Sequence, residues 1–217
     1  MGKFLVTQGD YLAVVGSNQS YFTSANGYSD DLTRPVEWVS WYDATNYCTL
    51  RTQQERAGGL IPTNYVYRLP TESEWEYADR AGTTTAFYLG SGFRSGQANI
   101  DCHYDYDASV GPIKYNTNCI YLAQTTAVGS YAANAWGLYD MIGNVLEWCQ
   151  DWYGSYPAGS VTDPQGAVTG SNRVYRGGCF SLGDFAWYCR SAGYRFYNRP
   201  GIRSNCVGFR VVLAPGQ

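Results

Sequence analysis

The chain has 217 residues, of which 45% are hydrophobic, and a formal net charge of -3 with 15 Lys and Arg residues. This length suits one buried core, so we expect a single domain over residues 1–217. The basic residues form no clustered run, which argues against nucleic-acid binding. No apolar stretch approaches the ~20 residues of a membrane span, and the N-terminus lacks a secretory layout, so we expect a soluble domain without a signal peptide.

Histidine and cysteine usage excludes the common catalytic centres. His103 is the single histidine, whereas zinc hydrolases, facial-triad iron oxygenases and His-based triads need more imidazoles than this chain has. We interpret His103 as a solvated bystander because its surroundings, NIDCHYDYDAS, are polar. The absence of any C-x-x-C pair argues against a zinc knuckle or a redox motif of the thioredoxin type. The seven cysteines are Cys48, Cys102, Cys119, Cys149, Cys179, Cys189 and Cys206.

Three N-terminal capping boxes predict three helices. In each box a Ser or Thr cap and an acidic residue three positions later satisfy each other's backbone N–H groups. The pairs are Thr7 with Asp10, Ser40 with Asp43 and Thr71 with Glu74, and the helices should end at Gly16, at Ala57 to Gly59 and at Gly82. We expect the acidic pairs of the third helix, Glu72 with Glu76 and Glu74 with Asp79, to be solvated outward charges and not an acid–base centre.

Short strands are predicted elsewhere, because β-branched and aromatic residues alternate between turn-forming residues. The candidates are Lys3–Val6, Trp136–Tyr139, Val145–Trp152, Arg173–Arg176 and Gly208–Leu213. Between Gly82 and Ala135 the sequence is rich in Gly, Asn, Asp, Ser and Thr and shows no periodicity. Such a length is unusual for a structureless loop, so something other than a helix or a sheet should hold it.

Five segments together resemble one family. They are PVEWVSWYDATNYC (35–48), YRLPTESEWEYADRAG (67–82), WGLYDMIGNVLEWCQDWY (136–153), RVYRGG (173–178) and GFRVV (208–212). In this order and spacing they resemble the formylglycine-generating-enzyme domain, or sulfatase-modifying-factor domain, a variant of the C-type lectin fold. The resemblance implies an α+β fold, rich in loops, with few helices and short antiparallel strands. It also places Met1 where the family has an internal methionine, so we expect a trimmed domain.

The resemblance does not carry the family's chemistry with it, because sites are grafted onto folds. Formylglycine-generating enzymes oxidise a substrate cysteine with two cysteines that follow the Gly-Gly pair. Aligned from Gly177-Gly178, those positions fall on Leu182 and Trp187, neither of which can ligate copper. We therefore expect a non-catalytic member. The alternative is a copper-dependent oxidase of protein cysteine that uses Cys179, Cys189 or Cys206.

Segment 179–206, CFSLGDFAWYCRSAGYRFYNRPGIRSNC, resembles the variable region of proteins diversified by retroelements. In those systems template adenines are randomised, and asparagine codons change into a set of residues that lacks Lys, Glu, Gln, Met and Trp. The segment contains no Lys, Glu, Gln or Met, and its one tryptophan, Trp187, fits the fixed framework of such regions. A rigid framework can present tolerant side chains whose identity changes the ligand without changing the fold.

This resemblance and the aromatic composition predict a ligand-binding surface, because exposed rings provide contact area at low entropic cost. The alternative is that the same rings fill a core. Residues 193–200 neither alternate nor follow a helical period, which favours exposure. The predicted ligand-binding residues are Phe180, Ser181, Leu182, Gly183, Asp184, Phe185, Tyr188, Gly193, Tyr194, Phe196, Tyr197, Asn198, Gly201, Ile202, Ser204, Asn205 and Cys206.

The turn DMIGNVLE matches a calcium site of the family, which implies a structural Ca²⁺ and no organic cofactor. Its ligands would be the carboxylates of Asp140 and Glu147 and the carbonyls of Gly143 and Val145, oxygen donors of the kind that calcium prefers. The alternative is a solvated turn in which Glu147 pairs with an arginine. A second family site would begin at Asn99 and Ile100, with further ligands around Asn118. Bound calcium would explain how the stretch from 82 to 135 is held.

We therefore expect a binding protein that recognises a partner protein or a cell-surface ligand through residues 179–206, with no nucleic acid and no membrane span. A cell surface, or the surface of a phage or virion, is the location that fits this role. A further possibility is an accessory domain within a larger surface protein.

Overall fold

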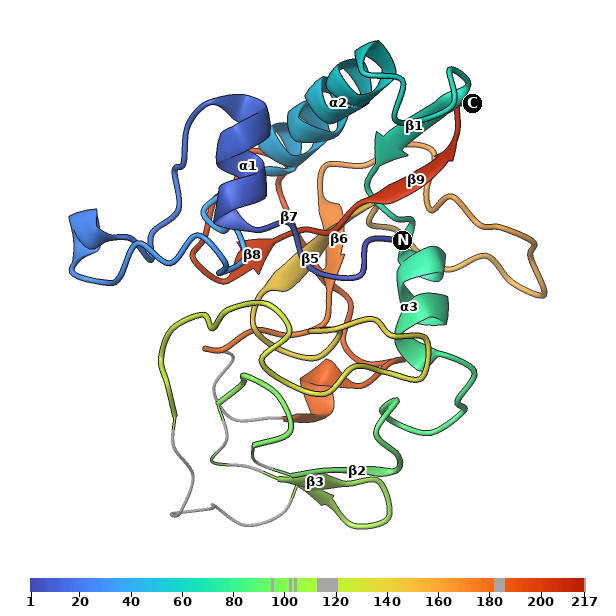
Figure 1. The fold of residues 1–217 in the computed structure, drawn as a ribbon. Coiled ribbons are helices and arrows are strands. Elements are labelled where there is room, and N and C mark those ends of the chain that lie inside the picture. Colours follow the sequence, from blue (N-terminus) through green and yellow to red (C-terminus); the bar gives the residue numbers. More distant parts are fainter. Residues whose placement is uncertain (95, 102, 104, 113–120, 182–185, 217) are drawn as a thin grey trace.

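The computed structural model describes residues 1–94, 96–101, 103, 105–112, 121–181 and 186–216 (Figure 1). Short strands and three α-helices in this part of the chain confirm the α+β class. The helices are α1 (Gln8–Val15), α2 (Trp41–Ala57) and α3 (Glu72–Arg80), with short 3-10 helices at η1 (Ser24–Asn26) and η2 (Ala186–Cys189). The strands are β1 (Tyr65–Arg68), β2 (Gly92–Phe93), β3 (Tyr106–Asp107), β4 (Gly111–Pro112), β5 (Leu146–Trp152), β6 (Arg173–Arg176), β7 (Phe196–Asn198), β8 (Val207–Gly208) and β9 (Val212–Pro215).

All three predicted capping boxes form. In each helix the cap side chain accepts the N3 backbone N–H, and the N3 carboxylate accepts the backbone N–H of the cap. The caps satisfy N–H groups that have no partner within the helix, and so fix where each helix begins. α3 ends one residue earlier than predicted, at Ala81, whose left-handed φ of 45° makes it the C-cap in place of Gly82.

A four-stranded sheet with the order β7-β6-β5-β8 forms the centre of the molecule. β5 pairs antiparallel with β6 and parallel with β8, and β6 pairs antiparallel with the edge strand β7. Figure 1 shows α1 and α2 side by side over one end of this sheet, with β2 and β3 beyond its other end. The main core joins sheet and helices through Val36, Val39, Tyr47, Leu69, Trp148 and Phe209, all at most 1% exposed.

Three predicted strands differ from the structure because their backbone groups find other partners. Residues 136–139 do not form a strand, since the chain turns at 135–137 and Asn134 Oδ1 accepts the N–H groups of both Trp136 and Leu138. Lys3–Val6 lies against residues 209–211 through single hydrogen bonds without forming a ladder. The last candidate splits into β8 and β9, because β8 pairs with β5 and β9 pairs with β1. Between them Arg210 is fully buried.

The stretch after α3 is held partly by packed rings. β2, β3 and β4 form a small antiparallel sheet, although no strand was predicted there. Phe87 packs on Phe93 and Tyr106, with ring centroids 5.6 and 5.7 Å apart. Ile142 and Ala186 join the same buried cluster and connect this stretch to the rest of the protein. The hydrophobic burial of these rings therefore stabilises a stretch whose sequence shows no helical or strand periodicity.

The expectation of solvated acidic pairs on α3 is wrong for Glu72 and Asp79, which are 4% and 0% exposed. Glu72 forms an ion pair with Arg195 (2.7 Å). Asp79 has no ion pair within 4 Å, and neither of its carboxylate oxygens has a partner in hydrogen-bond geometry among the described residues. Burial raises the pKa of Asp79 to about 7, and Ser191 and Arg176 offset only part of this effect. A buried carboxylate without such partners costs stability when it is charged.

Replacing Asp79 by asparagine should stabilise the protein at pH 8 and have little effect at pH 5. Between its unfolded pKa near 4 and its folded pKa of about 7, Asp79 binds more protons in the folded state, so its contribution to stability falls as pH rises. We expect a gain of at least about 1 kcal/mol at pH 8, measured by urea unfolding.

The exposed Asp163 serves as the matched control, and Asp163→Asn should leave the pH profile of wild type unchanged. An Asp79→Asn profile that runs parallel to wild type from pH 5 to pH 8 would contradict the burial argument.

Candidate functional site

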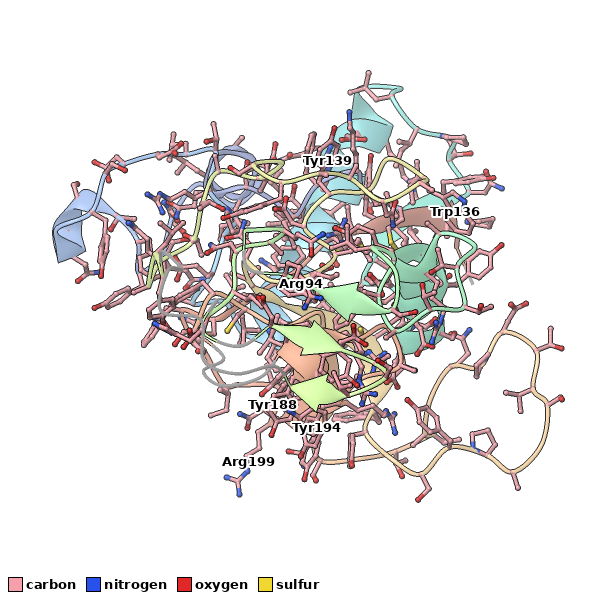
Figure 2. All side chains as sticks on the ribbon, turned by 90° about the horizontal axis from the view of Figure 1, so that it is seen from below. Arg94, Trp136, Tyr139, Tyr188, Tyr194 and Arg199 are labelled. Atoms are coloured by element: carbon pink, nitrogen blue, oxygen red, sulfur yellow. The ribbon has the colours of Figure 1, made fainter. Side chains whose placement is uncertain are left out.

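Rings from η2, from β7 and from the connection between them gather at one side of the molecule. Tyr194 contacts Phe196 edge to face (centroids 4.9 Å), and Tyr188 contacts both rings at 5.5 and 5.8 Å. Phe196 also stacks on its cross-strand neighbour Tyr175 (5.9 Å), which joins the group to the central sheet. Figure 2 shows Tyr188 and Tyr194 together in the lower part of the view, away from Trp136 at the upper right. We call Tyr188, Tyr194 and Phe196 the aromatic face.

The aromatic face reaches the surface, although Phe196 also packs against the main core. Tyr194 is 49% exposed, and Tyr188 and Phe196 are half-buried. Asn198, Ser204 and Asn205 are half-buried, and Ile202 is exposed. These predicted residues are therefore accessible to a partner at least in part.

β7 divides the predicted surface in two, because successive side chains of a strand point to opposite faces. Phe196 belongs to the aromatic face. Tyr197, 41% exposed, instead stacks on Tyr153 with ring centroids 3.8 Å apart. Arg195 lies over the rings of Tyr153 and Tyr156 at 4.9 and 4.0 Å, so it shares the neighbourhood of Tyr197.

Two predicted ligand-binding residues have structural roles. Phe180 is 3% exposed and packs edge to face on Phe22 (5.2 Å), so it is not the surface anchor that we expected. A Cβ on Gly193 would lie 2.6 Å from Arg190 O and 2.8 Å from Tyr188 O, so the position requires glycine. Gly201 has open space around it and could carry a side chain.

The remaining predicted residues lie at the ends of the segment. Ser181 is exposed, and Cys206 is half-buried beside Cys179. Leu182, Gly183, Asp184 and Phe185 lie outside the described residues.

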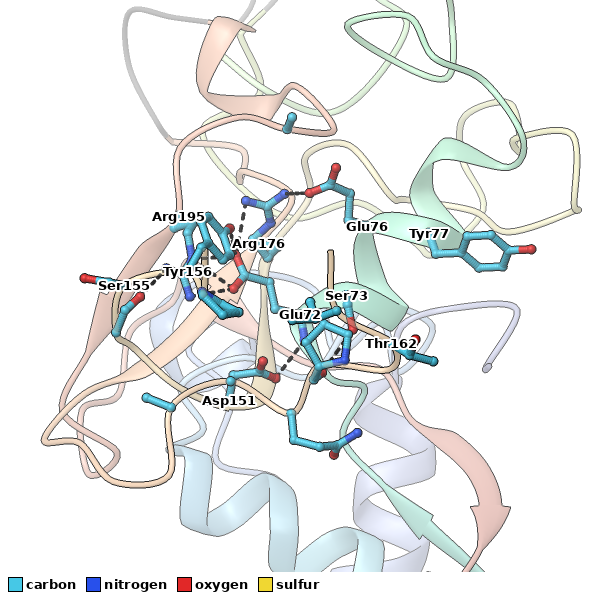
Figure 3. A pocket seen from close by; sticks show the side chains of 18 of the residues that line it. Glu72, Ser73, Glu76, Tyr77, Asp151, Ser155, Tyr156, Thr162, Arg176 and Arg195 are labelled. Atoms are coloured by element: carbon cyan, nitrogen blue, oxygen red, sulfur yellow. Dashed lines mark hydrogen bonds and ion pairs between the residues drawn. The ribbon is translucent and has the colours of Figure 1, made fainter. Parts of the chain in front are cut away.

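A cavity of about 1070 Å³, which the sequence did not predict, adjoins the Arg195 side of the segment (Figure 3). α3, the segment from 154 to 168, and residues 192, 193 and 195 line it. Glu72 accepts hydrogen bonds from Arg195 Nε (2.8 Å) and the Tyr156 hydroxyl (2.9 Å), and Glu76 accepts one from Arg176 (3.0 Å). No sequence pattern indicates this cavity, because it depends on how segment 154–168 folds over α3.

The charges at this cavity largely satisfy one another. The backbone N–H of Glu72 donates to Asp151 (2.7 Å), yet burial raises the pKa of that carboxyl to about 6. Burial, followed by the charge of Glu72, also raises the pKa of Tyr156. The cavity therefore offers fixed ion pairs at its base and exposed rings, Tyr77 and Tyr156, at its edge.

The predicted calcium turn is buried and rich in oxygen donors. Asp140 and Asn144 have left-handed φ values of 56° and 63°, and a Cβ on Gly143 would lie 2.4 Å from Asn99 O. The Gly129 N–H donates to Asp140 Oδ2 (2.7 Å). The buried carbonyl oxygens of Gly143 and Val145 accept no hydrogen bond from the described residues. Buried carbonyls without donors are unusual in proteins and fit a role as cation ligands.

Glu147 pairs with an arginine, as the alternative interpretation expected. Arg210 donates from Nε to Glu147 Oε2 (2.6 Å) and from Nη2 to Oε1 (2.9 Å), and both side chains are fully buried. Burial raises the pKa of Glu147, and Arg210 opposes that rise. Each oxygen of the Glu147 carboxylate keeps a second lone pair that could bind a cation. Asp140 and Glu147 together carry two negative charges when ionised, and Arg210 carries one positive charge. The donor set therefore fits a hard cation in addition to the ion pair.

Asn99 and Ile100 pack beside this turn. Asn99 O accepts the Asn144 N–H (2.7 Å), and its side-chain amide donates to Gln124 O (2.9 Å). Ile100 belongs to the buried ring cluster. The loop around Asn118, where further ligands of the second site were expected, lies outside the described residues.

The alternative chemistry would depend on Cys179, Cys189 or Cys206, of which Cys206 is half-buried. No cluster of three or more His, Cys, Asp or Glu side chains within them could hold a metal. Trp187 is half-buried on η2, and the cysteines at 179 and 189 are buried. His103 is half-buried and hydrogen-bonds to Asp101, so it is not the fully solvated residue that we expected. No described helix is long and apolar enough to span a bilayer.

The sulfatase-modifying factor enzyme 1-like domain matches residues 1–215. The chain belongs to this family. Over 217 residues it is 31% identical to the formylglycine-generating enzyme of Thermomonospora curvata. This alignment covers 94% of this chain and 64% of that enzyme. It is 36% identical over 182 residues to the serine/threonine-protein kinase pkn1 of Chlamydia caviae, covering 81% of this chain and 23% of the kinase.

A solved structure, Treponema denticola variable protein 1, superposes on this sulfatase-modifying-factor domain with a TM-score of 0.73 and 30% identity. The match covers 95% of this chain and 81% of that protein. The family resemblance and the likeness to a variable protein are thus both confirmed. The chain spans less than two thirds of the curated relatives named above, so their whole activities do not transfer to it.

Proposed function

We propose that this protein is a non-enzymatic binding protein whose aromatic face contacts a partner protein. The observation that carries the proposal is that Tyr194 is exposed, with the half-buried Tyr188 and Phe196 in contact with it, while Ala186 and Cys189 of η2 are buried. Exposed clustered tyrosines are typical of protein-binding surfaces. The likeness to a variable protein supports the proposal. Display on a cell, phage or virion surface suits this role.

The same proposal includes diversification by a retroelement. Tyr194 and Ile202 project from the surface, and Gly201 has open space around it, so these positions could tolerate replacement. Sequencing the neighbouring DNA tests this part. We expect a near-copy of the codons for 179–206 with asparagine codons at tolerant positions, beside a reverse transcriptase gene. A neighbourhood with neither would contradict diversification and leave the binding proposal to its own test.

A photo-crosslinking amino acid at position 194 should capture one protein from extracts of the source organism, and the same amino acid at position 136 should not. Once the partner is purified, Tyr194→Ala should weaken its Kd at least tenfold, because truncating a hot-spot ring at an interface costs about 2 kcal/mol or more. Trp136→Ala is the matched control, since Trp136 is similarly exposed but lies away from Tyr188 and Tyr194. Equal capture at both positions, or a Kd within twofold of wild type for Tyr194→Ala, would overturn the proposal.

The alternative, a copper-dependent oxidase of protein cysteine, is supported by the formylglycine-generating enzymes among the relatives. Against it, the family's cysteine positions carry Leu182 and Trp187, and Cys179 and Cys189 are buried; the half-buried Cys206 is the one described cysteine that could serve it. Oxygen uptake by copper-loaded protein on a cysteine peptide would establish this alternative and refute the non-enzymatic proposal.

We further propose that the turn at 140–147 binds one calcium ion through Asp140, Glu147 and the carbonyls of Gly143 and Val145. When bound, the ion would supply positive charge to two buried carboxylates that share one arginine. The orphaned carbonyl oxygens support this proposal.

Calcium at about a hundredfold excess over its Kd should raise the Tm of chelator-treated protein by about 5 °C, because a ligand that binds only the folded state stabilises it. Asp140→Asn should abolish most of this rise, whereas Asp163→Asn at an exposed position should not. A wild-type Tm that calcium leaves unchanged would contradict the site.

A further inference from the structure

Two cysteines at the ends of the ligand-binding segment lie next to each other. The N–H of Phe180, adjacent to Cys179, donates to Asn144 O (3.2 Å), and the Leu146 N–H donates to Cys206 O (2.8 Å). Both ends of the segment are therefore fixed to the same short stretch of backbone. Cys179 belongs to the main core and Cys206 packs against it, close enough for each thiol to shift the pKa of the other.

The two thiols differ in accessibility and in acidity. Cys179 is fully buried, and burial raises its pKa well above the usual value. Cys206 is half-buried, and its pKa is lowered, first by the hydrogen bond from Cys179 and further by the hydroxyls of Ser181 and Ser204. Burial, and to a smaller extent the carboxylate of Glu37, opposes this lowering of the pKa. A partly exposed thiol with stabilised thiolate is the nucleophilic kind, and a buried protonated thiol is not.

The other described cysteines lack this combination. Cys48, Cys149 and Cys189 are buried, and burial raises the pKa of each. Cys206 is thus the one half-buried cysteine of the described part of the chain, and its sulfur has a second thiol in contact.

We propose that Cys179 and Cys206 form a redox pair that a low-molecular-weight disulfide oxidises, joining the two ends of the segment that carries the aromatic face. This thiol chemistry does not depend on ligand binding. A cross-link between residues 179 and 206 would reduce the conformational freedom of the whole segment, as disulfides that close loops do.

The reaction is a thiol–disulfide exchange in two steps. The Cys206 thiolate attacks one sulfur of the small disulfide, whose S–S bond breaks, and the departing thiolate takes a proton from water to become a thiol. Cys179 then loses its proton to water and attacks Cys206 Sγ, which releases a second small thiol. The second small thiolate also takes a proton from water. Counted from the form in which both cysteines are thiols, the protein loses two electrons and two protons, and the small disulfide is reduced to two thiols.

Oxidised glutathione is the probe, applied to the folded full chain. Cys102 and Cys119, outside the described residues, are replaced by serine in every variant. After an acid quench, free thiols are alkylated under denaturing conditions and linkages are mapped by mass spectrometry of unreduced peptides. We expect a Cys179–Cys206 linkage, with Cys206 modified at least tenfold faster than Cys189. Cys189→Ser is the matched control and should form the same linkage.

The single variants distinguish the two roles. Cys179→Ser should accumulate glutathione on Cys206, whereas Cys206→Ser should leave Cys179 reduced. Circular dichroism checks that each variant is folded, and if Cys179→Ser is not, the transient mixed disulfide on Cys206 in the parent gives the same information. Modification of Cys189 as fast as Cys206, or a linkage that excludes Cys179, would overturn the proposal.

Discussion

The buried ion pair between Glu147 and Arg210 is the interaction on which the rest of the structure depends. Beyond its two hydrogen bonds to Glu147, the Arg210 guanidinium donates to Gly2 O (3.2 Å) and Tyr139 O (2.9 Å). One side chain therefore joins the N-terminal segment, the turn before β5, β5 itself and the link from β8 to β9. Removing one partner of such a pair leaves a buried charge without compensation, which typically costs about 3–5 kcal/mol.

This arrangement separates the part of the chain that folds from the part that we propose binds. The strands are too short and the connections too long for strand pairing alone to stabilise the fold. Polar side-chain contacts, such as those of Asn134 with the backbone of Trp136 and Leu138, take the place of strand-to-strand hydrogen bonds. The aromatic face is attached to this framework at one edge, through Phe196 on Tyr175. Its outermost ring, Tyr194, can change without removing a core contact, which is the physical requirement for a surface that varies while the fold does not.

The sequence predicted the elements whose causes are local. Capping boxes at Thr7, Ser40 and Thr71 need only a residue and its neighbour three positions later, and all three form. The burial of Glu72 and Asp79 could not be predicted in this way, because it depends on β6, on Arg195 and on the segment from 154 to 168, which are distant in sequence. The strand expected at 136–139 failed for a different, local reason, since the Asn134 side chain accepts the N–H groups of Trp136 and Leu138, and the alternation of residues does not reveal this competition.

The candidate site shows the same division. The resemblance placed exposed rings in the segment after Gly178, and Tyr194 and Tyr197 are indeed exposed. It could not show that β7 directs Phe196 and Tyr197 to different sides, nor that Phe180 packs against Phe22, because both depend on strand pairing and on a distant loop. The adjacency of Cys179 and Cys206 likewise results from their common attachment to residues 144–146.

Urea unfolding of two variants at pH 7 tests the central claim, that the framework folds independently of the surface it presents. The double variant Tyr194→Ser with Ile202→Ser should keep its free energy of unfolding within about 1 kcal/mol of wild type, because exposed side chains contribute little to stability. Glu147→Gln should lose about 3 kcal/mol or more, since Arg210 would stay buried and unpaired. A double variant that loses as much as Glu147→Gln would show that the aromatic surface is part of the folding core and would contradict the account.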